Sequence, residues 1–166
     1  MKRLLNIWQI LGFAFTAIMG VLLHFLYEWT GGSNFVAPFS AVNESIWEHM
    51  KLLFFPMFIF ACIEKWYIGK DYKNFWCVKL LGIMLGIILI PVLYYTLNGI
   101  FGKIPDWINI AIFFVTAAIS YFVETKLLNK HLINCKYSTT ALLIMWIIAF
   151  LFGLFTFTTP QIPLFK

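Results

Sequence analysis

Residues 21–58 read VLLHFLYEWTGGSNFVAPFSAVNESIWEHMKLLFFPMF, and this stretch decides the fold class. It holds two apolar segments with a short polar segment between them, in which histidines and glutamates gather. A helix needs about 20 apolar residues to cross the hydrocarbon core of a bilayer. Charged side chains are costly at that depth, so those that remain there are expected to bind, to react or to be neutralised by partners.

The composition places the whole chain in a membrane. Hydrophobic residues make up 62% of the 166 residues and charged residues only 11%, whereas a soluble domain is about half apolar and a quarter charged. The length fits one domain. We therefore expect residues 1–166 to form a single all-α transmembrane domain, a multi-pass protein of the cell membrane whose partner is the lipid bilayer and not a nucleic acid.

Five membrane spans are predicted, over residues 7–27, 46–63, 78–97, 108–123 and 141–157. If the N-terminus is cytoplasmic, nine of the twelve lysines and arginines fall on the inner side. Only Lys51, Lys103 and Lys166 fall near the outer side. Because cytoplasmic loops carry the excess of positive charge, the N-terminus is predicted inside and the C-terminus outside.

Two further expectations follow from this topology. Cys62, Cys77 and Cys135 lie at predicted cytoplasmic ends, where thiols stay reduced, so three free thiols are expected. Small residues also recur every four positions in the first and third spans. Because small residues let helices approach closely in lipid, these two helices are expected to pack together through Gly12, Gly20, Gly82 and Gly86.

Two pairs of polar residues stand at the outer ends of the first two spans. His24 and Glu28 are four residues apart, so they share one face of the first helix. Glu44 and Glu48 share a face at the start of the second helix in the same way. Since the two helices are antiparallel neighbours, both pairs are expected at the same depth. His24, Glu28, Glu44 and Glu48 are therefore the candidate catalytic residues.

Other polar residues are predicted to surround this group in an outward-facing pocket between the first, second, third and fifth helices. The candidate substrate-binding residues are Asn43, His49, Lys51, Tyr94, Tyr95 and Asn98. Helical geometry turns His49 about 140° away from Glu44, so the sequence leaves open whether His49 joins the group. Asn43 also stands where a helix cap belongs. The third histidine, His131, lies in a basic loop and is expected at the membrane surface.

Three interpretations of the pocket remain open. Histidines and carboxylates on facing helices can bind a metal ion, although the chain has only three histidines and no His-Glu-x-x-His motif. Crowded carboxylates in an apolar pocket can instead serve as general acids, or as counter-charges for a cationic group. In the third interpretation, Lys51 and the histidines simply neutralise the glutamates. The pattern therefore leaves the metal and the cofactor undetermined.

The segments NESIWEHMKLLFFPM (43–57), LLHFLYEW (22–29) and TTPQIPLF (158–165) resemble a family of small bacterial multipass membrane proteins of unknown function. Members of that family continue beyond the IPLF element, so the resemblance implies that this chain ends early at Lys166. LLHFLYEW is also similar to the His-x3-Glu segment of emopamil-binding-type sterol isomerases, five-span proteins in which an acid and histidine cluster handles a carbocation. That likeness implies that His24 and Glu28 correspond to the pair, and Glu44 or Glu48 to a second acid.

A last resemblance concerns ESIWEH (44–49), which is similar to the Asn-Ile-Trp-Thr-His region of progestin and adiponectin receptor-type zinc hydrolases. That family also needs a late His-x3-His, which this chain lacks. The favoured interpretation is an intramembrane enzyme that uses acid/base chemistry on a lipid-like or isoprenoid substrate. The alternatives are a protein that binds or transports a small cation or amine, and a structural membrane protein with neutralised interfacial charges. A transporter would need polar residues across the midplane, and residues 52–60 supply none.

Overall fold

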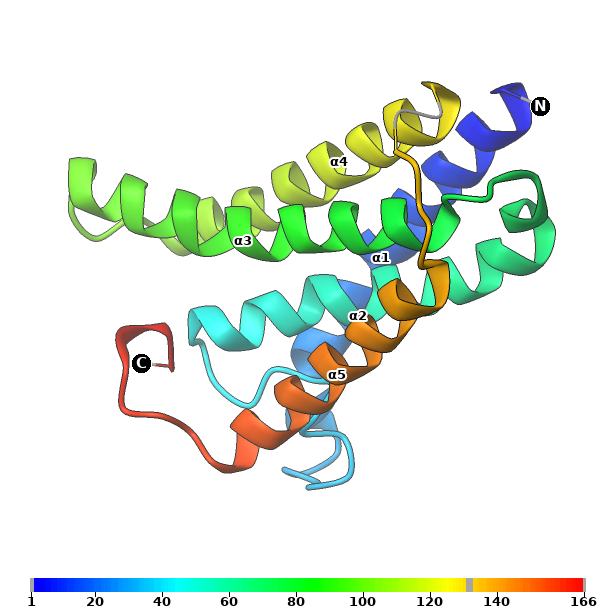
Figure 1. Cartoon of the computed structure of the whole chain (residues 1–166). Coiled ribbons are helices and arrows are strands. Elements are labelled where there is room, and N and C mark those ends of the chain that lie inside the picture. The colour runs from blue at the N-terminus through cyan, green and yellow to red at the C-terminus, as the bar shows by residue number, and fades with distance from the viewer. Residues whose placement is uncertain (1, 131–132, 166) are drawn as a thin grey trace.

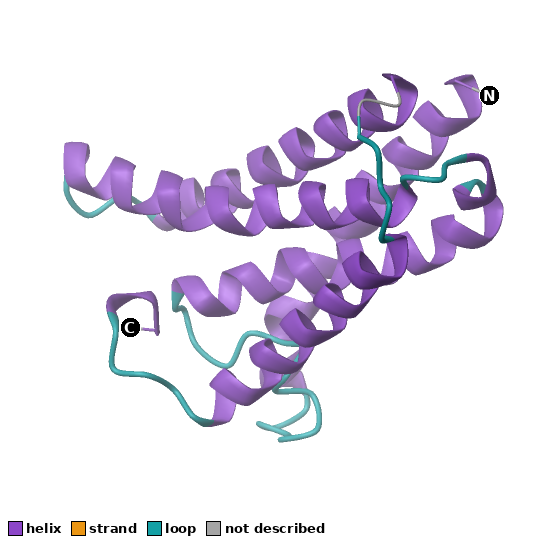
Figure 2. Cartoon of the chain, viewed as in Figure 1, coloured by secondary structure: helices purple, strands orange, loops and turns teal. Residues whose placement is uncertain are grey.

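The computed structural model describes residues 2–130 and 133–165 and consists of five long helices (Figure 1). These are α1 (Lys2–Trp29), α2 (Ile46–Tyr67), α3 (Phe75–Phe101), α4 (Asp106–Lys130) and α5 (Ser138–Phe157). Two short 3-10 helices, η1 (Gly69–Asp71) and η2 (Pro163–Phe165), follow α2 and α5. The part of the chain that is described contains no strand (Figure 2). The all-α prediction is confirmed, and each predicted span lies within one of these helices.

All five helices are long and apolar enough to cross a membrane. Each also extends beyond the apolar run that predicts it, because the polar residues at the ends continue the helix. The chain is thus compatible with a multipass membrane protein.

Helix α2 lies at the centre of the bundle. It packs against α1, α3, α4 and α5, while α3 and α4 run side by side along their length (Figure 1). Side chains of α2 such as Leu53, Phe54 and Ala61 are completely buried. In the outer helices α1 and α5, few residues of the apolar span are buried and the others are partly or fully exposed, as expected of surfaces that face lipid.

The glycine-containing faces of α1 and α3 were predicted to pack against each other, but they do not. A β-carbon added at Gly12 would lie 2.6 Å from the ring of Tyr121 in α4, and one added at Gly82 would collide with the side chain of Glu124. Gly20 and Gly86 likewise face Phe113, Leu53 and Ser120. The glycines do permit close approach, but the space they leave is filled by large side chains of α4 and α2.

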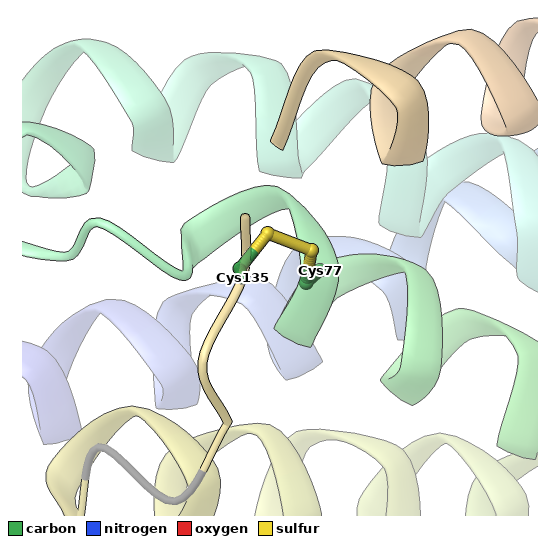
Figure 3. The surroundings of a disulfide bond; sticks show 2 residues. All are labelled: Cys77 and Cys135. Carbon is green, nitrogen blue, oxygen red and sulfur yellow. A yellow bond between two sulfur atoms is a disulfide. The ribbon is translucent and has the colours of Figure 1, made fainter. Parts of the chain in front are cut away.

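In the structure, a disulfide bond takes the place of two of the three free thiols that the sequence predicts. Cys77, in the first turn of α3, is bonded to Cys135 in the connection between α4 and α5, with a Cα–Cα distance of 6.1 Å (Figure 3). Cys62 remains free. The two bonded residues are 58 positions apart, and only the return of the chain from α4 past the start of α3 brings them together.

Candidate functional site

The connection between α1 and α2 folds back onto the end of α1. The Ser40 hydroxyl donates a hydrogen bond to the carbonyl of Leu23 and accepts one of 2.9 Å from the backbone N–H of Tyr27. A side chain inserted in this way lies between two residues four apart, whose backbone groups are paired directly in a regular helix. The end of the connection is therefore fixed beside His24, which lies within the same turn.

A tight turn precedes α2. Ser45 is the N-cap, and its hydroxyl accepts a hydrogen bond of 3.4 Å from the backbone N–H of Glu48. Asn43 accepts one of 2.9 Å from the backbone N–H of Ser45 through its Oδ1. Asn43 thus orders the turn and does not itself cap the helix. Glu44 lies in this turn, before the first residue of α2, so it does not share a helix face with Glu48 as predicted.

His24, Glu44 and His49 come together here, and we name these three residues the histidine–glutamate cluster. The Nε2 atoms of His24 and His49 each lie 3.7 Å from a different carboxylate oxygen of Glu44. Glu44 is 80% exposed in its side chain, whereas His24 and His49 are 27% and 20% exposed. The cluster therefore has two partly buried imidazoles beneath one solvent-facing carboxylate, and His49 does join the group.

A hydrogen bond determines the tautomer of His49. Its Nδ1 lies 2.9 Å from the carbonyl oxygen of Ser45. A carbonyl oxygen can only accept, so Nδ1 carries the hydrogen and Nε2 of the neutral ring keeps its lone pair. That lone pair is on the side of the ring that faces Glu44, where it can take up a proton or bind a metal ion.

Three cavities border the cluster. A cavity of about 160 Å³ is lined by His24, His49 and mainly apolar residues of α1 and α4, among them Val21, Phe25, Ile110 and Phe114. A smaller one of about 20 Å³, with room for about one water molecule, is lined by Glu44, His49, Tyr94 and Asn109. A groove of about 480 Å³ is bordered by His24, Glu28, Asn43 and Glu44. Helix α4 thus lines the site in place of the predicted α5.

The model of one protein family matches residues 2–166. The chain belongs to the family of unknown function DUF6512. No curated protein matches the sequence, and no solved structure matches it. Membership of DUF6512 therefore assigns no activity, and a function has to be argued from the residues themselves.

Glu48 and Lys51 of this DUF6512 chain are engaged elsewhere. The Nζ of Lys51 lies 2.6 Å from Oε2 of Glu48, and both side chains are almost completely buried. Glu48 also accepts a hydrogen bond of 2.8 Å from the backbone N–H of Val42. Lys51 donates to the carbonyl of Ala37 at 2.9 Å and to the hydroxyl of Thr156 at 2.8 Å. This pair ties the connection and α5 to α2, so the predicted convergence of Glu48 with His24 is wrong.

The remaining predicted residues lie around the site in different roles. Glu28 borders the open groove, and Tyr94 lines the smallest cavity. Tyr95 is 43% exposed and packs edge-on against Tyr94. Asn98 donates to the carbonyl of Tyr94 at 2.8 Å and accepts from the backbone N–H of Ile104 at 3.2 Å, which joins the end of α3 to the next connection. His131 lies outside the described residues.

Asn109 was not predicted from the sequence. Its Oδ1 is buried and has no hydrogen-bond partner among the described residues, and the side chain borders both cavities that His49 lines. A buried amide oxygen without a partner is uncommon. A polar residue within the first turns of an apolar helix is the signal that could have revealed it.

A second polar group, also not predicted as a unit, lies at the opposite end of the bundle. Lys79 of α3 forms ion pairs with Glu64 of α2 and with Glu124 of α4, the latter at 2.6 Å. Gln9 of α1 donates a hydrogen bond of 2.6 Å to Glu64. All four side chains are at most 4% exposed. Buried ion pairs are tolerated only when each charge is partnered. This network, which we name the Lys79 network, joins four helices.

Proposed function

We propose that this protein is an enzyme of the cell membrane that uses acid/base chemistry on a lipid-like or isoprenoid substrate. One observation carries the proposal: the histidine–glutamate cluster borders an apolar cavity between α1 and α4. Pockets that bind apolar ligands usually combine such a lining with a few polar groups. The apolar cavity of about 160 Å³ has room for a group about the size of a benzene ring. The reacting end of an acyl or isoprenoid chain would occupy it beside the imidazoles, and the rest of the chain would extend into the bilayer.

Each member of the cluster has a role in this proposal. His49 serves as the general base, because the hydrogen on Nδ1 is held by Ser45 and Nε2 is left to accept a proton from the substrate. His24, when protonated, returns one proton to another position of the substrate, so no proton is gained or lost overall. Glu44 stabilises whichever imidazole is charged, since it lies 3.7 Å from both. Histidine suits this exchange because its protonation changes near neutral pH.

Binding of a small cation or amine is the second candidate function. The open groove places the carboxylates of Glu28 and Glu44 along one cavity, and Glu44 is mostly exposed. Transport across the membrane is less well supported, because residues 52–60 of α2, between the cluster and the Lys79 network, are apolar. The observations thus favour a pocket that opens on one side.

We further propose that the cluster faces the outside of the cell, as the distribution of lysine and arginine predicts. Lys51 and Lys79 are buried in ion pairs and so do not interact with lipid headgroups. Without them, eight cations still fall on the inner side and two on the outer side. The charge bias therefore does not depend on the two buried lysines.

The test is the conversion of lipids by the purified protein. Wild-type protein would be reconstituted into vesicles of bacterial polar lipid extract supplemented with polyprenols, and the lipids compared before and after incubation by liquid chromatography coupled to mass spectrometry. The chromatographic step is needed because an isomer has the mass of the substrate and differs in retention time. We expect a lipid species to be consumed by the wild type, with at least a tenfold lower rate for His49→Ala and for Glu44→Gln. Asp106→Asn, which changes a carboxylate at the start of α4, is the control and should keep the wild-type rate. An unchanged lipid profile with wild-type protein would favour the binding function instead.

A further inference from the structure

We propose that His24, Glu44 and His49 bind one divalent transition-metal ion of the zinc class. The proposal concerns the same site as the proposed function, and metal binding can be measured without any turnover. With the ion bound, both histidines would be ligands, so their acid and base roles proposed above belong to the metal-free protein. Two imidazoles and one carboxylate are a common ligand set for catalytic zinc and for non-haem iron. Magnesium and calcium prefer oxygen ligands only, so the two nitrogen atoms argue against them.

The distances within the cluster suit a single ion. One ligand atom from each of the three residues can be chosen so that all lie within 4.8 Å of one another, and each histidine Nε2 is 3.7 Å from Glu44. Ligand atoms bound to one tetrahedral zinc ion are about 3.4 Å apart. The distances between the ligand atoms therefore need to shorten only slightly. Movement of the Glu44 side chain can shorten them, because this side chain is 80% exposed.

The surroundings of His49 strengthen this inference. Metal-binding histidines commonly donate the hydrogen of the other ring nitrogen to a carbonyl or carboxylate, which orients the ring. The Nδ1 of His49 has such a partner in the carbonyl of Ser45, at 2.9 Å. Ser45 is itself fixed as the N-cap of α2 and by the Asn43 side chain. A simple ion pair between His49 and Glu44 would not need this arrangement.

Three protein ligands leave a fourth coordination position open, as in catalytic zinc sites. The cavity of about 20 Å³ lies beside Glu44 and His49 and has room for about one water molecule. Asn109 lines the same cavity, and its Oδ1 has no hydrogen-bond partner among the described residues. A water molecule bound to the metal there would donate to this oxygen. The metal inference therefore also accounts for the unpartnered amide of Asn109.

The test measures metal content and coordination directly. Full-length protein without a polyhistidine tag would be purified in detergent, stripped with a chelator and dialysed against micromolar zinc, with bound metal counted by mass spectrometry. We expect about one zinc ion per chain in the wild type. His24→Ala and His49→Ala should each retain less than about a tenth of that amount, because each removes one of only three ligands. His131→Ala is the matched histidine control and Asp106→Asn the carboxylate control; both should bind as the wild type does.

Substitution of cobalt for zinc supplies a second measurement. A tetrahedral site with two nitrogen ligands should give visible absorption bands that disappear in His49→Ala, and Glu44→Gln should weaken binding at least tenfold. Because Glu44 is exposed, Glu44→Gln should leave the thermal stability of the metal-free protein unchanged. Absence of stoichiometric zinc in the wild type, or equal zinc binding by both histidine variants, would overturn the proposal. Lipid turnover by the stripped protein that zinc then inhibits would support both proposals, because the ion would occupy Nε2 of His49. Turnover without zinc binding would reject the metal and keep the acid/base function, whereas zinc binding without turnover in either form would keep the metal and reject that function.

Discussion

Lys79 and Glu124 lie 2.6 Å apart, from Nζ to Oε2, and neither side chain reaches the surface of the protein. Lys79 is also paired with Glu64, so one ammonium group serves two carboxylates. With all three groups charged, the site would hold one negative charge in excess. This imbalance makes the two kinds of partner unequal, because loss of the lysine leaves two unpaired carboxylates, whereas loss of one glutamate leaves a balanced pair.

The first prediction compares loss of the lysine with loss of one glutamate. Lys79→Met should lower the free energy of unfolding by about 3–5 kcal/mol, because it leaves buried carboxylates without a counter-charge. Glu124→Gln should cost much less, since Lys79 keeps Glu64 and the shape of the side chain is preserved. Thermal unfolding of both variants in the same detergent would measure the difference. Equal losses in the two variants would mean that the network is held by packing and not by charge.

The sequence predicts the helices, but it does not predict all the partners of their charged residues. Hydropathy predicts all five helices because each apolar run is longer than a soluble helix requires. The antiparallel order of the first two spans likewise places His24 and Glu44 at the same end of the bundle. The sequence could not choose the partner of Glu48, because it offers both Lys51 three residues later and His24 on α1. In the structure Lys51 pairs with Glu48, and His24 lies against Glu44 instead.

The sequence also does not determine which helices pack against each other. The four-residue spacing of small residues around Gly12 and Gly82 correctly indicates close approach. In lipid, however, no hydrophobic driving force acts between helices, so hydrophobicity does not select which helix packs there. The contacts depend on large side chains such as Tyr121 and Glu124 that fill the space beside each glycine. Prediction of these pairs needs the rotation of α4 about its axis, which its apolar sequence does not specify.

The second prediction uses two glycines of α3. A β-carbon at Gly86 would lie 2.6 Å from both Leu53 and Ser120, whereas nothing lies within 4 Å of one at Gly99. Gly86→Leu should therefore lower stability by about 1–3 kcal/mol through overpacking, with a lower melting temperature in detergent. Gly99→Leu is the matched control and should be neutral or slightly stabilising, because leucine favours helix more than glycine does. An unchanged melting temperature for Gly86→Leu would place that face of α3 against lipid.

The third prediction concerns orientation. On a cysteine-free background, Lys103→Cys in the connection between α3 and α4 should react with a membrane-impermeant maleimide added to intact cells. Lys70→Cys, after α2, should react only after the cells are opened, because the positive charges predict this end inside. The opposite labelling pattern would place the histidine–glutamate cluster on the cytoplasmic side.

The orientation has a consequence for Cys77 and Cys135, which lie at the end predicted to be cytoplasmic. Cytoplasmic thiols are normally kept reduced, so in cells quenched with alkylating reagent before lysis we expect both cysteines to be modified. The bond should form after purification under air, as a mass lower by two hydrogens. A disulfide already complete in quenched cells would instead support the reversed orientation, and the maleimide labelling would have to agree with it.

The last prediction separates a structural from a catalytic role for Glu48. Lys51 is completely buried, and its Nζ lies 2.6 Å from the carboxylate of Glu48. The same ammonium group donates hydrogen bonds to the carbonyl of Ala37 and to the hydroxyl of Thr156. Lys51→Met should therefore destabilise the protein by about 3–5 kcal/mol, since it leaves the Glu48 carboxylate buried and unpaired. Adding Glu48→Gln to Lys51→Met should restore part of that stability, because the second substitution removes the unpaired charge. Thermal unfolding of the two single variants and the double variant gives this coupling directly. If Glu48→Gln instead abolishes lipid turnover while stability and zinc content stay at wild-type values, Glu48 acts in the reaction and its pairing with Lys51 is secondary.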